Sequence, residues 1–139
     1  MKRLVDVAVR WLQRWPKWTA TALTVGVILW LTLSSRPVGD VDVPVFPGID
    51  KAVHGIMFGW LAMMLIMDWG KQRGQRSGLR GAFVCAVLSA AFGVGIEFLQ
   101  ASMSLGRSYE VADMYADAAG AGAVYAVFVL RRLLAARNT

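Results

Sequence analysis

The chain has 139 residues, the length of one domain, but a composition of 57% hydrophobic and 17% charged residues excludes an ordinary soluble domain. Its 15 Lys and Arg residues against 9 Asp and Glu give a net charge of +6. In so apolar a chain this excess favours a membrane surface over nucleic acid as the partner. One cysteine and one histidine exclude an internal disulfide and every zinc motif that needs several Cys or His ligands.

Residues 1–17 are predicted to form an interfacial amphipathic helix on the cytoplasmic membrane surface. On a helical projection the basic side chains gather on one face, opposite a face that carries Trp11 and Trp15. The basic residues are Lys2, Arg3, Arg10, Arg14 and Lys17. The alternative is the n-region of a cleaved signal peptide, but SSRPVGD follows the apolar run, and this segment has no A-x-A cleavage site.

Four apolar segments predict an all-α membrane four-helix bundle within residues 18–130, followed by a basic cytoplasmic tail at 131–139. The segments cover about residues 19–35, 50–69, 81–101 and 113–130. Each has roughly the 17–25 residues that a helix needs to cross the hydrocarbon core, where the backbone must satisfy its own hydrogen bonds. The fourth segment is rich in Ala and Gly, so we expect it to be packed among its neighbours rather than facing lipid.

The basic residues predict the orientation of these helices. All but three of the 15 lie in the N-terminal segment, in the turn at 70–80 or in the tail. The exceptions are Arg36, Lys51 and Arg107. With four spans, both termini and the 70–80 turn share one side of the membrane, and the positive-inside rule makes that side cytoplasmic.

The ionisable residues of the spans predict a polar cluster near the outer boundary of the membrane. With the expected topology, eight polar residues from separate segments share one level: Asp50, Lys51, His54, Glu97, Gln100, Arg107, Asp113 and Asp117. Ionisable groups are rare in membrane helices and mark functional sites. The i,i+4 spacing of Asp50 with His54, and of Asp113 with Asp117, lets each pair share one helix face.

Small residues beside these pairs predict close helix contacts. Gly55 and Gly59 form a GxxxG pattern next to His54, and Ala116 with Gly120 forms a small-xxx-small pair in the fourth segment, as does Ala119 with Ala123. Such residues allow two helix backbones to approach closely, which brings neighbouring polar side chains within contact distance.

The chemistry of the cluster suggests roles for its members. Glu97, His54 and Asp117 are the candidate catalytic residues, because a carboxyl–imidazole pair can perform general acid–base catalysis. The candidate ligand-binding residues are Asp50, Lys51, Gln100, Arg107 and Asp113, with the two cations suited to holding a phosphate or carboxylate. No nucleotide- or NAD-binding motif is present. One histidine among oxygen ligands is a loose metal signal, so we expect neither a metal nor another cofactor.

Structural explanations of the same residues stay open. Asp50 and Asp113 are also helix-end charges that suit the helix dipole, and His54 is also explained as a hydrogen-bonded packing residue. Arg107 could form a structural ion pair with Glu97 or Asp117. In that case the cluster only locks the helices together, and the protein is a non-enzymatic membrane adaptor or a small transporter subunit.

The order of these motifs resembles the VanZ-like family of small membrane proteins. The resemblance covers about residues 34–123 and rests on SSRP, on DKAVH with its Asp, Lys and His, on the Glu and Gln of GIEFLQ, and on GRSYEVAD. The family usually carries Asn where this chain has Asp117, which adds a negative charge here.

The resemblance implies a multi-pass protein of the bacterial cytoplasmic membrane. The member that names the family is linked to resistance to teicoplanin, a lipoglycopeptide that acts on cell-wall precursors outside the membrane. The implied ligand is therefore a lipid-linked or glycan cell-wall molecule or the drug, with membrane lipid and further copies of the chain as other expected partners and no nucleic acid. The resemblance names no reaction, so whether the protein is an enzyme stays open.

Overall fold

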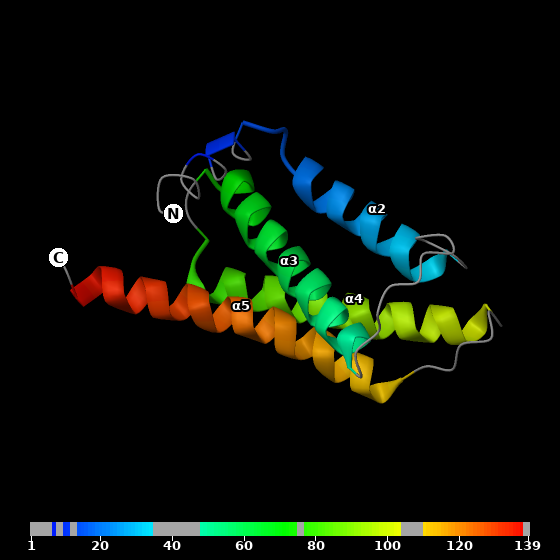
Figure 1. Ribbon diagram of the computed structural model, residues 1–139. Coiled ribbons are helices and arrows are strands. Elements are labelled where there is room, and N and C mark those ends of the chain that lie inside the picture. Colours follow the sequence, from blue (N-terminus) through cyan, green and yellow to red (C-terminus); the bar gives the residue numbers. More distant parts are fainter. Residues whose placement is uncertain are drawn as a thin grey trace.

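The structure, a computed structural model, is all-α over the part of the chain it describes, residues 7, 10–11, 14–34, 48–74, 77–103 and 110–137. Four helices follow one another: α2 (Thr19–Leu33), α3 (Ile49–Gln72), α4 (Leu79–Ser102) and α5 (Val111–Arg137) (Figure 1). This confirms the predicted fold class. The amphipathic helix expected at residues 1–17 falls largely outside the described residues.

Three of these helices, α3, α4 and α5, are long and apolar enough to cross a membrane. The first helix, α2, is apolar but has 15 residues, about 22 Å of helix at 1.5 Å per residue. A hydrocarbon core is about 30 Å thick, so the described part of α2 is shorter than the span expected at 19–35.

The last helix is longer than the sequence pattern suggested. Residues 131–137, expected to belong to a basic tail, continue α5 as far as Arg137. Leu, Ala and Arg are strong helix formers, and no Gly or Pro interrupts this stretch, so the helix continues past the apolar segment.

Asp68 anchors the start of α2 at one end of the bundle. Its Oδ2 accepts hydrogen bonds from the Thr21 amide at 3.1 Å and from the Thr21 hydroxyl at 2.7 Å, while Lys71 Nζ lies 3.0 Å from Oδ1. The first amides of a helix lack partners within the helix, and the helix dipole favours a negative charge there. The carboxylate of α3 therefore serves as an N-terminal cap for α2.

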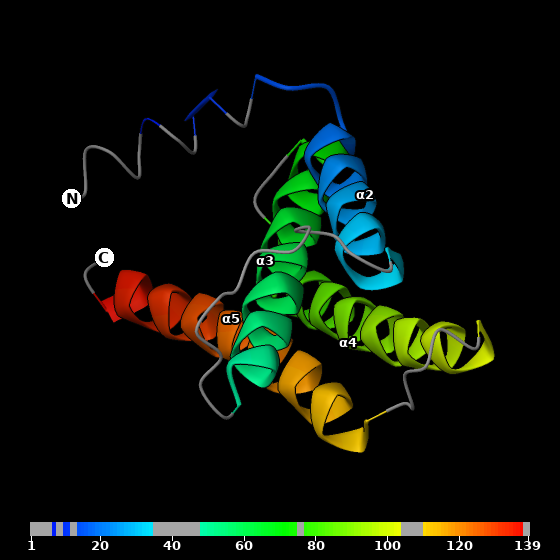
Figure 2. The same ribbon diagram turned by 45° about the vertical axis from the view of Figure 1, so that its right-hand side comes forward.

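Two further hydrogen bonds connect the helices at the end that holds Asp68, and one connects them at the opposite end. Ser77 Oγ donates to the Ile66 carbonyl at 2.6 Å, and Arg132 donates to the Ser77 carbonyl at 2.7 Å. At the opposite end Gln100 Nε2 donates to the Thr32 carbonyl at 2.8 Å. The starts of α3 and α5 and the end of α4 thus share one end of the bundle (Figures 1 and 2).

The closest helix contact is the crossing of α3 and α5, here called the glycine crossing and formed by Gly55, Gly59 and Gly120. A Cβ added at Gly59 would lie 3.0 Å from the Gly120 carbonyl oxygen, and one added at Gly120 would overlap the Gly55 carbonyl. The close approach expected of the GxxxG pattern is confirmed. Of the two small-residue pairs in α5, Ala116 with Gly120 faces α3, whereas Ala119 is exposed.

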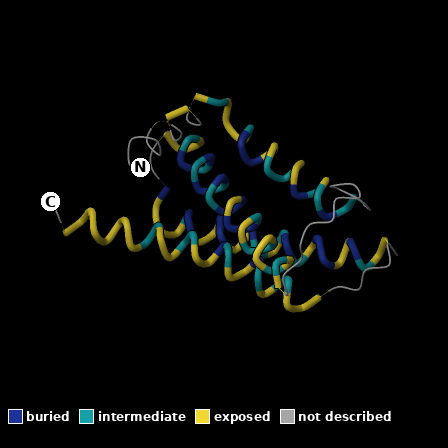
Figure 3. Tube along the Cα trace, viewed as in Figure 1, coloured by how far each residue is buried: buried dark blue, intermediate teal, exposed yellow. Residues whose placement is uncertain are grey.

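The expectation that the fourth apolar segment is enclosed by its neighbours is wrong. The large core side chains come from the other helices and include Ile28, Phe58, Leu61 and Ile96. In α5 only Asp117 and Ala121 are buried, and most of the helix is exposed (Figure 3). Small residues let α5 pack closely along one narrow face, where Val124, Tyr125 and Phe128 are partly buried against the core. Other large side chains of α5, such as Tyr115 and Leu130, are exposed.

We predict that Gly120→Ala destabilises the protein, because the new methyl group overlaps the Gly55 carbonyl. Overpacking of this kind costs about 1–3 kcal/mol. Gly122→Ala is the matched control, since a Cβ there meets nothing within 4 Å. Thermal unfolding of the purified protein in one detergent should show a lower Tm for G120A and no decrease for G122A. Equal Tm values for the two variants would contradict the close crossing.

Candidate functional site

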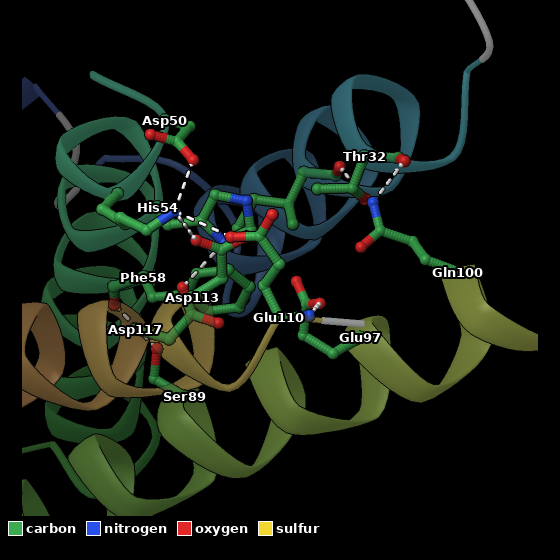
Figure 4. A network of polar contacts seen from close by, with 12 residues as sticks. Thr32, Asp50, His54, Phe58, Ser89, Glu97, Gln100, Glu110, Asp113 and Asp117 are labelled. Carbon is green, nitrogen blue, oxygen red and sulfur yellow. Dashed lines mark hydrogen bonds and ion pairs between the residues drawn. The ribbon is translucent and has the colours of Figure 1, made fainter. Parts of the chain in front are cut away.

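Seven polar side chains from three helices and the residue before α5 converge at the end of the bundle where α3 and α5 begin (Figure 4). We call them the polar cluster: Asp50, Lys51 and His54 of α3, Glu97 of α4, Glu110, and Asp113 and Asp117 of α5. The three members from α3 lie within about one and a half helical turns. Asp50 and His54 are four residues apart and therefore lie on the same face of the helix.

Lys51 forms the outer part of the cluster. Its Nζ lies 2.6 Å from Asp50 Oδ2, 2.8 Å from Glu110 Oε2 and 3.3 Å from Asp113 Oδ1. The side chains of Asp50 and Glu110 are 52% and 55% exposed, whereas that of Asp113 is 13% exposed. The Lys51 ammonium group therefore links α3 to α5. It lies between the exposed carboxylates of Asp50 and Glu110 and the more buried carboxylate of Asp113.

His54 and Asp117 form the inner part. His54 Nδ1 lies 3.1 Å from Asp117 Oδ1, and the Asp117 side chain is 0% exposed. Asp117 fits between the helices because Gly93 faces it from α4, where an added Cβ would overlap the carboxylate. The His54 side chain is 15% exposed, but the Asp117 carboxylate cannot turn to water, so loss of this hydrogen bond is costly.

Glu97 closes the cluster on the α4 side. Its side chain is buried, and its Oε2 accepts a hydrogen bond from the Glu110 amide at 3.1 Å. This bond holds the start of α5 against the end of α4. The cluster is consequently exposed at Asp50 and Glu110 and buried at Glu97 and Asp117.

Two carboxylate oxygens in the buried part have no hydrogen-bond partner among the described residues. They are Asp113 Oδ1, whose contact is the 3.3 Å ion pair with Lys51, and Asp117 Oδ2. Buried polar atoms are nearly always hydrogen-bonded, so each unpaired oxygen calls for a functional explanation.

Most of the residues expected at one membrane level come together. Six of the eight are in the polar cluster: Asp50, Lys51, His54, Glu97, Asp113 and Asp117. Gln100 is buried nearby, but its amide joins α4 to α2 through Thr32 (Figure 4). Arg107, and with it the expected ion pair to Glu97 or Asp117, lies outside the described residues.

Glu110 is the member that sequence reasoning missed as a site residue. It touches both Lys51 and Glu97, through its carboxylate and its amide respectively. The sequence offered one sign that Glu110 belongs to the cluster. It lies three residues before Asp113, directly before α5, and residues at i and i+3 share a helix face.

Three long apolar helices define the class of protein as a helical membrane protein, here with a cluster of ionisable side chains among its helices. The sequence profile of the VanZ/LLP1 family matches residues 6–132, nearly the whole chain, and the protein belongs to this family. No curated protein matches the chain. No solved structure matches it either.

We predict that Gly93→Ala disturbs the buried end of the cluster, because its methyl group would overlap the Asp117 carboxylate. Gly95→Ala, two residues along the same helix, is the control, since a Cβ there meets nothing within 4 Å. The Tm of G93A should fall by several degrees, as expected for a loss of about 1–3 kcal/mol, while G95A keeps that of the native protein. A native Tm for G93A would show that Asp117 does not pack against α4.

Proposed function

We propose that the polar cluster binds the polar part of a lipid-linked or glycan cell-wall ligand at the outer face of the bacterial cytoplasmic membrane. The observation that carries this proposal is the convergence of ionisable side chains from three helices into one cluster with an exposed rim and a buried inner part. Such groups are costly in a membrane, and a bundle gains little from burying so many of them unless they serve a function.

An apolar groove beside the cluster supports a ligand with a hydrocarbon chain. It has a volume of about 470 Å³ and runs along the outside of the glycine crossing, lined by residues that include Ala52, Ile56, Trp60 and Met63. Its lining includes Ala52 and Gly55, which lie on the same helical turn as Lys51 and His54. A lipid-linked molecule could place its polar part at Lys51 and its chain along α3 and α5.

The proposed roles follow from the contacts. Lys51 is the anion-holding group, since an ammonium at an exposed rim can bind a phosphate or carboxylate. His54 and Asp117 form the acid–base pair, and Glu97 is the third candidate for proton transfer. This proposal takes α2 as a fourth span; the positive-inside rule then favours both termini on the cytoplasmic side and the cluster at the outer leaflet.

A second function is favoured by the internal contacts of Lys51. Its ion pairs with Glu110 and Asp113 join α3 to the start of α5, which is what a purely structural cluster would do. In that case the protein is a membrane adaptor or transporter subunit and has no ligand at this site.

We predict that cells expressing the native chain show reduced susceptibility to teicoplanin, and that Lys51→Gln, His54→Gln and Glu97→Gln each abolish this protection. The reason is that each substitution removes a charge or proton-transfer group from the proposed binding site. The measurement is the inhibitory concentration of teicoplanin, with protein abundance in the membrane followed by immunoblot. Arg137→Gln at the opposite end of α5 is the control for charge removal.

Loss of protection at normal abundance supports a binding site. Normal protection by all three variants, or loss that only follows a loss of protein, would contradict the binding role and support the structural one.

A further inference from the structure

The inner part of the polar cluster carries three groups in the arrangement of a metal site. One ligand atom from each of His54, Glu97 and Asp113 can be chosen so that all three lie within 4.8 Å of one another. Ligand atoms around a tetrahedral zinc ion lie about 3.4 Å apart, from bond lengths near 2.1 Å. The three side chains would therefore have to move closer together to bind one ion.

Asp117 orients the histidine as metal sites require. It contacts His54 Nδ1 at 3.1 Å, so Nε2, which has no hydrogen bond to the described residues, is the ring nitrogen for a cation. A histidine that binds a metal through one nitrogen almost always donates its other N–H to a carboxylate or carbonyl, which fixes the tautomer and the ring orientation.

The charges of the inner cluster are incompletely balanced. Asp113 Oδ1 is shielded from solvent and has no hydrogen bond among the described residues, and its ion-pair partner Lys51, 3.3 Å away, is also hydrogen-bonded to Asp50 and Glu110. Across the described cluster, five carboxyl groups face one ammonium and one imidazole. Asp50 and Glu110 are more than half exposed, whereas the other three carboxylates are largely shielded from water, and a bound cation offsets the cost of burying their charge.

We propose that His54, Glu97 and Asp113 bind one divalent first-row transition-metal ion, with Asp117 as the positioning residue for His54. One imidazole and two carboxylates suit Mn²⁺ or Zn²⁺ better than Ca²⁺, which prefers oxygen ligands alone. This goes beyond the proposed function, because the ion can bind whether or not a cell-wall ligand does.

The test is metal binding by the purified full chain in detergent, stripped with a chelator and then titrated with Mn²⁺ or Zn²⁺. Elemental analysis gives the stoichiometry, and calorimetry gives the affinity. We expect about one ion per chain, bound at least tenfold more weakly after Glu97→Gln or Asp113→Asn. Asp117→Asn should weaken binding about tenfold, the usual effect of losing a carboxylate that orients a ligand.

Glu110→Gln separates this trio from a neighbouring group, Asp50, Glu110 and Asp113, whose ligand atoms also lie within 4.8 Å of one another. Its affinity should stay within a few-fold of the native value. Arg107→Gln tests the competing idea that the arginine supplies the missing charge. A native chain that binds no ion, or binds one only after R107Q, would overturn the proposal, as would equal weakening by E110Q and E97Q. No lipid or drug enters this experiment, so its failure leaves the teicoplanin test unaffected.

Discussion

The close approach of α3 and α5 at the glycine crossing is the constraint on which the rest of the site depends. Where the backbones touch, the register of one helix on the other is fixed, because a shift by one residue would bring a Cβ against a carbonyl. Both helices start at the same end, so their polar residues form successive contacts along the crossing. Lys51 meets Asp113, and one turn further His54 meets Asp117. The small residues of α5 thus matter less for burying surface than for aligning two rows of ionisable groups.

The buried carboxylates at the two ends of the bundle differ in how fully they are hydrogen-bonded. Asp68 is completely buried and has a partner for each oxygen, two groups of Thr21 for one and Lys71 for the other. This is how a structural carboxylate is stabilised. Asp113 and Asp117 are also enclosed, yet each has an oxygen without a hydrogen bond among the described residues. The contrast within one chain is the main reason to treat the polar cluster as a site for something that binds, rather than as a second Asp68.

Hydropathy predicted the three long helices, and the small-residue pattern predicted which faces of α3 and α5 meet. The level of the ionisable residues along the expected helices was enough to predict that His54, Glu97 and Asp117 lie together. The partners of individual side chains were not predictable, because they depend on helix rotation and tilt. No sequence pattern marked Asp68 as the residue that caps α2, and Gln100, predicted to bind a ligand, contacts Thr32 instead.

The central claim is that α3 and α5 bring His54 and Asp117 into direct contact. Because the chain has one histidine, labelling histidine with ¹⁵N marks a single residue, and ¹³C-labelled aspartate supplies the second nucleus. Solid-state NMR of the protein in lipid bilayers can then measure dipolar coupling between the imidazole nitrogen and a side-chain carboxyl carbon. The 3.1 Å contact between Nδ1 and Oδ1 predicts a strong coupling that disappears in the Asp117→Asn variant when only aspartate is labelled. No such coupling in the native protein, or one that persists in the variant, would contradict the account.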